Sequence, residues 1–98
     1  MSGIIEEKGI KENVGKLNYE LDWEFIEAMA ARMSKNKSKY PPYNWHKKIE
    51  VDNLKQSLIR HVIEIMKGSY EDDEDELGHV VAVACNIQMI YYQLKTFK

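Results

Sequence analysis

The chain has 98 residues, 44% of them hydrophobic, and a formal net charge of −2. This length allows one domain near the small end of what a single core stabilises, and the nearly balanced charge excludes a strongly basic protein that binds DNA or RNA polymers. The single cysteine excludes an intrachain disulfide, and no uncharged apolar run reaches the roughly 18 residues that a membrane span needs. We therefore expect a globular protein of the reducing cytoplasm, without a membrane partner.

The N-terminal part of the chain is predicted to be an arm followed by a helix. Residues 1–18 contain glycines among charged residues, with too few apolar side chains to pack a face. The folded domain then extends over residues 19–98, and its first helix is predicted at residues 19–34. Two consecutive prolines break any helix after that, so residues 35–48 are predicted to be a loop.

Two further helices follow the loop. The second helix is predicted to be capped by Asp52 or Asn53 and to end at Gly68. The acidic run 71–76 then leads, without a proline, into a third segment that is apolar on nearly all sides and extends to about residue 94. A helix of this kind is usually central in its domain, and the short connection predicts that the second and third helices are antiparallel neighbours.

Together these elements predict an all-α fold, a small antiparallel helical bundle. No strand pattern or internal repeat is present, and Cys85, in the third helix, is expected to be buried. Three helices of this size do not enclose a helix that is apolar all round, so we expect a homo-oligomer, a dimer or higher, to complete the core.

Two histidines and two glutamates are candidate metal ligands. His61 and Glu64 are three residues apart near the end of the second helix, and Glu76 and His79 have the same spacing near the start of the third. Antiparallel packing would bring the four side chains together, and imidazoles and carboxylates bind divalent ions in helical bundles. On spacing alone, the alternative is that the histidines are hydrogen-bonded core or rim residues and the glutamates are solvated. The acidic run 71–76 lacks the ligand spacing of an EF-hand and is interpreted as a solvated cluster that the helix dipole favours.

The loop interleaves cations with aromatic rings. Lys39 precedes Tyr40, and Asn44 precedes Trp45. Lysines suit phosphates, aromatic rings suit stacking on a base, and an amide can hydrogen-bond a base edge. The alternative is that the rings close the end of the bundle and the lysines are solvated. No serine nucleophile elbow or glycine-rich phosphate loop is present.

The order of these motifs resembles that of the small phage and bacterial proteins classed as dATP/dGTP diphosphohydrolase-like, which are related to the MazG-type all-α nucleoside triphosphate pyrophosphohydrolases. The resemblance extends over residues 9–94, and each motif alone is weak. The matching residues are Gly9, Lys11, Gly15 and Lys16, then Lys39, Tyr40, Asn44 and Trp45, then Arg60 and His61, then Glu76, Leu77, Gly78 and His79, and finally Asn86.

The resemblance implies a MazG-like bundle that hydrolyses a (deoxy)nucleoside triphosphate to the monophosphate and pyrophosphate, with Mg²⁺ or Mn²⁺ as cofactor. The implied metal ligands are His61, Glu64, Glu76 and His79. Of these, the implied catalytic residues are Glu64, Glu76 and His79. The implied nucleotide-binding residues are Lys16, Lys39, Asn44, Trp45, Arg60 and Asn86.

The chain also departs from the patterns that it resembles. Histidines stand at two of the four carboxylate positions of the MazG signature, Asn13 stands where the closer family has Asp, and Pro41 stands where it has Gly. Magnesium prefers oxygen ligands, so the imidazoles favour manganese or another transition ion. The lost carboxylates motivate a second hypothesis, a non-catalytic protein that binds a nucleotide or a nucleotide-derived signal as a sponge or sensor. A third hypothesis is a helical interaction protein without a ligand.

Overall fold

The computed structural model describes residues 20–35 and 40–98 of the chain. They form the α-helices α2 (Trp23–Met33), α3 (Val51–Met66) and α4 (Gly78–Thr96) and the 3₁₀ helix η3 (Asn44–His46). No strand occurs in this part of the chain, so the predicted all-α class is confirmed. None of these helices is long and apolar enough to cross a membrane. The predicted arm at residues 1–18 lies outside the described residues.

Helix α2 begins where Asp22 caps it. The Asp22 carboxylate accepts hydrogen bonds from the backbone N–H groups of Glu24, at 3.0 Å, and Phe25, at 3.2 Å. Both groups lie in the first turn, where the helix itself offers no acceptor. The start predicted at residue 19 is wrong, because residues 20–22 are not α-helical.

The start of α3 also differs from the prediction. The helix begins at Val51, before either of the residues predicted to cap it, and the cap position belongs to Glu50, which makes no side-chain capping bond. The backbone N–H of Asn53 already donates to the Glu50 carbonyl, at 3.0 Å. The caps predicted at Asp52 and Asn53 are therefore wrong, since both residues lie inside the first turn.

The end of α3 confirms the prediction made for Gly68. This glycine has a φ of +83°, the left-handed conformation that side chains disfavour. Its N–H donates to the Ile65 carbonyl and the Ser69 N–H donates to the Glu64 carbonyl, both at 2.9 Å. The two bonds form the Schellman arrangement, which satisfies carbonyl groups left without partners at the end of the helix.

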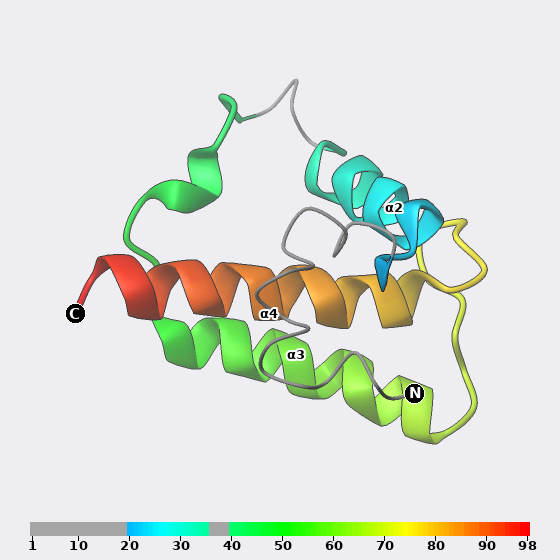
Figure 1. The fold of residues 1–98 in the computed structure, drawn as a ribbon. Helices are drawn as coiled ribbons and strands as arrows, with labels where there is room; N and C mark the ends of the chain where they lie inside the picture. The colour runs from blue at the N-terminus through cyan, green and yellow to red at the C-terminus, as the bar shows by residue number, and fades with distance from the viewer. Residues whose placement is uncertain (1–19, 36–39) are drawn as a thin grey trace, which may run out of the picture.

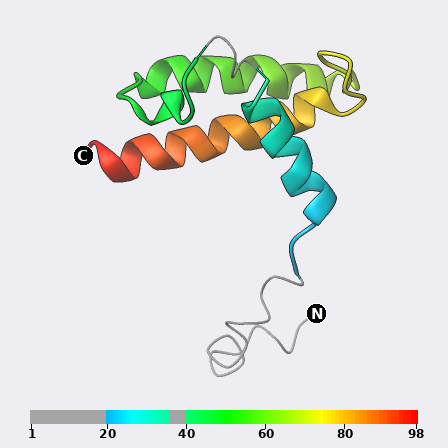
Figure 2. The ribbon, with the colours of Figure 1, turned by 90° about the horizontal axis from the view of Figure 1, so that it is seen from above.

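Helix α4 is the central helix of the described fold. It packs against α2, α3 and η3, and α3 lies beside it in the antiparallel direction (Figure 1). Figure 2 shows that α2 crosses the N-terminal half of α4 at a steep angle. The buried side chains of α4 include Val81, Ala82 and Cys85. The predicted central position of this helix and the predicted burial of Cys85 are confirmed.

The acidic segment between α3 and α4 is a tight turn. The backbone N–H of Asp72 donates to the carbonyl of Asp75, and the N–H of Asp75 donates back to the carbonyl of Asp72, both at 3.0 Å. Asp73 and Glu74, between them, have positive φ values of 53° and 66°. This is the backbone pattern of a type I′ turn. The acidic residues therefore fold back on themselves before α4 begins, instead of forming its first turn.

Gly78 lets this turn lie against the start of α4. The residue is buried, and a Cβ at this position would collide with the backbone carbonyl of Asp72. The backbone N–H of His79 donates to the carbonyl of Tyr70, at 2.9 Å, and holds the other side of the turn. The close approach places the side chain of Asp72 beside the first turn of α4.

Candidate functional site

A cleft of about 760 Å³ lies between α2, the segment that begins at residue 40, and the facing sides of α3 and α4. Its apolar wall contains sulfur-bearing and aliphatic side chains, namely Ile26, Met29, Met33, Cys85 and Met89. Aromatic side chains reach it from the loop, namely Tyr40, Tyr43 and Trp45. Its polar and charged lining groups include Arg32, Asn44, Ser57, His61 and Asn86. A cleft of this volume, mainly apolar with a few polar groups, is typical of a small-molecule site.

A buried asparagine lies in the wall of the cleft. Only 5% of Asn86 is exposed, and its Nδ2 donates to the Oγ of Ser57 on α3, at 3.2 Å. A buried amide needs such a partner, because an unsatisfied polar group is costly to bury. The bond links α3 to α4 at the cleft and fixes the orientation of the amide.

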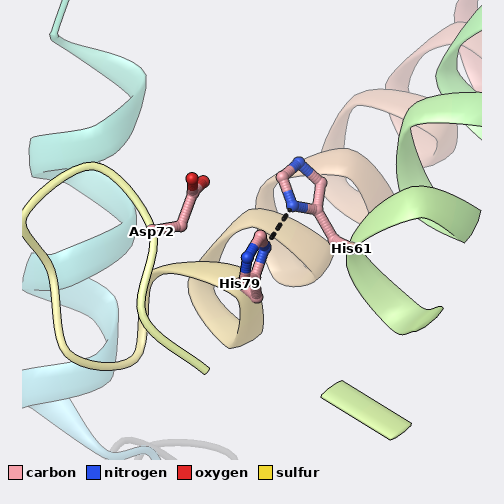
Figure 3. Close-up of side chains that lie close together, drawn as sticks. All are labelled: His61, Asp72 and His79. Atoms are coloured by element: carbon pink, nitrogen blue, oxygen red, sulfur yellow. Dashed lines mark hydrogen bonds between the residues drawn. The ribbon is translucent and has the colours of Figure 1, made fainter. Parts of the chain in front are cut away.

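Three possible metal ligands converge beside the cleft. The Nδ1 atoms of His61 on α3 and His79 on α4 are 2.8 Å apart, and Asp72 in the acidic turn lies next to them (Figure 3). One ligand atom from each residue lies within 4.8 Å of the other two. All three side chains are partly exposed. The group is thus built from three segments that are separate in the sequence.

The contact between the two imidazoles restricts their protonation. One Nδ1 must donate and the other must accept, so the geometry disfavours protonation of both rings. Burial lowers the pKa of His61 below 6.5, and the charges of Arg32 and His79 lower it further, while Asp72 acts in the opposite direction. A neutral imidazole is the form that binds a metal ion.

Arg32, in the last turn of α2, is paired with Asp72. Its Nη2 lies 2.9 Å from Asp72 Oδ2, and its Nη1 donates to the carbonyl of Gly78, at 3.4 Å. Burial alone would raise the pKa of the Asp72 carboxyl, but the hydrogen bond and the charge of Arg32 hold it below 3.8. Arg32 therefore connects α2 to the acidic turn and to the start of α4. The sequence contains no periodic signal for this pair, because the two residues lie 40 positions apart.

Gln93 holds the aromatic loop, residues 40–49, against α4. Its exposed fraction is 2%, its Oε1 accepts from the backbone N–H of Ile49, at 3.0 Å, and its Nε2 donates to the carbonyls of Trp45, at 3.2 Å, and Lys47, at 2.7 Å. The Trp45 ring also packs edge-on against Tyr92, with ring centroids 5.2 Å apart. The amide and the ring contact together fix the position at which Trp45 lines the cleft. Sequence analysis missed Gln93, although it lies seven residues after Asn86 and thus on the same face of the helix.

Residues 6–98 match the protein family described as "dATP/dGTP diphosphohydrolase, N-terminal". The chain belongs to this family. A relative in it, the "dATP/dGTP diphosphohydrolase" of Salmonella phage PMBT28, is 32% identical over 87 residues, which are 88% of this chain and 30% of that protein. The chain thus spans about 30% of the length of this diphosphohydrolase. No solved structure matches it.

Family membership confirms the resemblance that the motifs carry, but the predicted metal ligands do not all meet. His61 and His79 converge as expected, whereas Glu64 pairs with Lys67 one turn along α3, at 3.3 Å, and Glu76 is exposed. Neither glutamate belongs to the ligand group found in the described part of the chain. Their spacing of three residues predicts Glu76 and His79 on one helical face. However, α4 begins only at Gly78, so Glu76 lies before the helix. Asp72, which sequence analysis did not single out, provides the nearby carboxylate.

The predicted nucleotide-binding residues of this family member fall into three groups. Asn44, Trp45 and Asn86 line the cleft. Arg60 is exposed on α3 and does not line it. Lys16 and Lys39 lie outside the described residues. The cleft therefore contains the residues predicted to contact a base. The positively charged residue that lines it in the described structure is Arg32, which was not predicted to bind the nucleotide.

Proposed function

We propose that this protein is a metal-dependent pyrophosphohydrolase that cleaves (deoxy)nucleoside triphosphates, with dATP and dGTP as first candidates, to the monophosphate and pyrophosphate. The observation that carries the proposal is one cleft whose lining combines the ring of Trp45 and the amides of Asn44 and Asn86 with His61. His61 in turn belongs to the ligand group beside the cleft. The name of the phage relative supports the substrate class.

His61 and His79 would hold a divalent ion, and Asp72 would turn toward it. Two ligands at right angles on an ion with bonds of about 2.1 Å are about 3.0 Å apart, and the Nδ1 atoms of His61 and His79 are 2.8 Å apart. Two imidazoles and one carboxylate suit manganese or another transition ion better than magnesium. The bound ion would polarise the phosphate and lower the pKa of an attacking water. Glu64 and Glu76 remain predicted ligands that variants can test.

The cleft residues would position the nucleotide. Trp45 would stack on the base, because a base offers its π-face to an aromatic ring and such stacking contributes about 1–3 kcal/mol. Asn86, fixed by Ser57, and Asn44 would hydrogen-bond the base edge. The apolar wall with its methionines would exclude water from the bound nucleotide, and methionine adapts to irregular shapes. No covalent intermediate is required.

The activity is tested by incubating the purified protein with each (d)NTP and Mn²⁺ or Mg²⁺ and measuring pyrophosphate and monophosphate. We expect turnover of a purine deoxynucleotide with Mn²⁺, and an Asp72→Asn variant should lose at least about tenfold, the lower limit for disturbed metal sites. Asp73→Asn is the matched control, because Asp73 lies in the same turn and pairs with Lys35 at 3.4 Å. No turnover of any nucleotide with either ion would refute the proposal.

A second candidate function is nucleotide binding without cleavage. It is favoured by the ligand group, in which one carboxylate stands beside two imidazoles. Fewer negative charges hold fewer divalent ions, and a site without enough ions binds phosphates without activating water. Recovery of intact nucleotide from a tight complex, in the presence of Mn²⁺, would favour this function over hydrolysis.

We also propose that the protein acts as a homo-oligomer in the host cytoplasm. Three large side chains on α3 (Ile59, Ile63 and Met66) and three on α4 (Ile87, Tyr91 and Leu94) are each 49% to 80% exposed. On each helix they recur at spacings of three and four residues, so they form a stripe. Exposed apolar surface of this kind marks interaction sites. The one cysteine is unpaired and buried, which suits a reducing compartment.

A further inference from the structure

Arg32 is the cation that the described structure offers to a ligand in the cleft. Among the described residues that line the cleft, it alone carries a permanent charge. Its side chain is 22% exposed, so a ligand in the cleft has access to part of it. Arginine presents a planar array of donors that fits phosphate oxygens, and it remains protonated at any physiological pH.

The guanidinium already has a partner, and that partner belongs to the ligand group. Arg32 Nη2 lies 2.9 Å from Asp72 Oδ2, and Asp72 is the one carboxylate that converges with His61 and His79. Both side chains of the pair are partly exposed, 22% and 27%. An exchange of partners would keep both charges paired, Arg32 with a phosphate and Asp72 with the ion.

The charges make the two kinds of binding depend on each other. With Arg32 beside Asp72, a divalent cation at His61 and His79 meets a positive neighbour and a carboxylate that is already neutralised. A polyphosphate brings the negative charge that offsets Arg32 and the ion together. Each ligand therefore improves the site for the other, and such coupling is reciprocal by thermodynamic necessity.

We propose that Arg32 couples the binding of the divalent ion to the binding of the nucleotide phosphates. In the ligand-free protein Arg32 is paired with Asp72, and it transfers to a phosphate group when Asp72 turns to the ion. This inference rests on the proposed nucleotide-binding function. It assigns the phosphate contact to Arg32, a residue on α2 that is not among the motif residues by which the sequence resembles this family.

A simpler role for Arg32 makes the opposite prediction. If Arg32 stayed on Asp72 Oδ2 and only oriented the carboxylate toward the ion, its removal would weaken ion binding even without nucleotide. If Arg32 is exchanged, its removal frees Asp72 and takes away a repelling charge. Ion binding without nucleotide would then be unchanged or tighter.

The test is calorimetric titration of the whole chain with Mn²⁺ alone, with a non-hydrolysable dATP analogue alone, and with the analogue in the presence of saturating Mn²⁺. The variants are Arg32→Met, Arg32→Lys and Asp72→Asn. The control is Lys35→Met, which also removes a cation at the end of α2 that pairs with an aspartate of the acidic turn, Asp73. Circular dichroism of each variant establishes that it is folded.

In the wild type, Mn²⁺ should tighten binding of the analogue by about tenfold or more, the ordinary scale of such coupling. Arg32→Met should bind Mn²⁺ at least as tightly as the wild type, bind the analogue about tenfold or more weakly, and lose most of the coupling. Arg32→Lys keeps the positive charge and should retain part of the coupling. Asp72→Asn should release Arg32, so that the analogue binds without Mn²⁺ at least as tightly as to the wild type. Lys35→Met should keep the coupling.

Two results would overturn the inference while leaving the proposed function intact. One is an Arg32→Met protein that binds Mn²⁺ more weakly than the wild type, and the other is an Arg32→Met protein with unchanged coupling. A wild-type protein that binds neither ligand would overturn the inference and the proposed function together. An Arg32→Met variant that is unfolded leaves the decision to the Arg32→Lys and Asp72→Asn titrations, where wild-type behaviour in both contradicts the exchange.

Discussion

At the scale of single residues, the 2.8 Å contact between His61 and His79 ties the stability of the fold to protonation. Burial and, after it, the charges of Arg32, His79 and Arg60 hold the pKa of His61 below the value of 6.5 that it has in the unfolded chain, while Asp72 acts in the opposite direction. Between the folded pKa and 6.5, the unfolded chain binds more protons than the folded protein. Stability therefore falls as the pH is lowered through this interval.

The first prediction follows from this loss of stability at lower pH. The melting temperature should decrease from pH 7 to pH 5, and a His61→Asn variant should show a smaller decrease, because it lacks the group that takes up the proton on unfolding. Melting curves at half-unit steps measure the effect, with His46→Asn as the control histidine outside the group. Equal pH dependence in the wild type and His61→Asn would contradict the account. The Asp72 contribution is separate, since its pKa lies below 3.8 and its stabilisation is lost only in stronger acid.

Gly78 provides the second residue-scale prediction. A Cβ at this position would collide with the carbonyl of Asp72, so Gly78→Ala should displace the acidic turn and destabilise the protein by about 1–3 kcal/mol, as overpacking does. Mn²⁺ affinity should fall with it, because Asp72 moves away from the histidines. Denaturant unfolding and Mn²⁺ titration measure the two effects.

Gly68→Ala is the matched control for that variant. A Cβ at Gly68 meets no atom within 4 Å, but its φ of +83° strains any other residue. We expect a loss of about 1 kcal/mol with unchanged Mn²⁺ affinity. If Gly78→Ala also left the Mn²⁺ affinity unchanged, the close approach of the turn would not be what positions Asp72.

At the scale of elements, the cleft depends on how the aromatic loop is attached to α4. Gln93 makes this attachment through three hydrogen bonds to the backbone of residues 45–49. In its described residues the loop contains η3 and little other regular structure, so the backbone groups there depend on such partners. This buried amide, together with the contact between the rings of Trp45 and Tyr92, thus fixes where Trp45 lies.

The third prediction concerns that amide. Gln93→Glu replaces the donor that faces the carbonyls of Trp45 and Lys47 with an acceptor, and it should destabilise the protein by roughly 1–3 kcal/mol. Urea unfolding measures the loss, and nucleotide titration should show weaker binding, since Trp45 is no longer held in the cleft. Gln56→Glu, at an exposed position of α3, is the control and should change neither. Wild-type stability of Gln93→Glu would show that the loop is held by other contacts.

The elements also show which structural features the sequence predicts and why it does not predict the others. Gly68 and the short acidic connection predict antiparallel α3 and α4, and that packing brings His61 to His79. The Arg32–Asp72 pair joins residues 40 positions apart, and the Gln93 contacts join residues 44 to 48 apart. The periodicity of apolar residues indicates only which side chains are neighbours within one helix, so it does not reveal polar pairs between distant segments. The sequence likewise gives no glycine at Asp73 or Glu74 to indicate the positive φ values of the acidic turn.

At the scale of the whole molecule, the described fold leaves apolar side chains on its outside. The stripes on α3 and α4 contain Met66, with 80% of its surface exposed, and Tyr91, with 64%. A domain of this size buries a small fraction of its surface and is only marginally stable alone. A second copy of the chain that packed its own stripes against these helices would bury them in a four-helix arrangement.

The fourth prediction is the oligomeric state. Light scattering coupled to size-exclusion chromatography should give the mass of a dimer or higher oligomer at micromolar concentration. Ile63→Lys combined with Ile87→Lys should shift the mass toward the monomer, because a buried lysine without a partner is costly. Glu27→Lys on the exposed side of α2 is the control for added charge. A wild-type protein with the mass of the monomer would contradict the prediction.

The walls of the cleft come from four stretches of chain, and none of these stretches encloses a volume alone. A partly folded chain therefore lacks the cleft, and the nucleotide of the proposed function would meet its full set of contacts only after α2, the loop and the antiparallel pair have all docked. Bound nucleotide would then draw the population toward the completed structure by mass action, in proportion to its concentration over its dissociation constant. In a cell, the substrate pool itself would set how much of this protein escapes proteolysis.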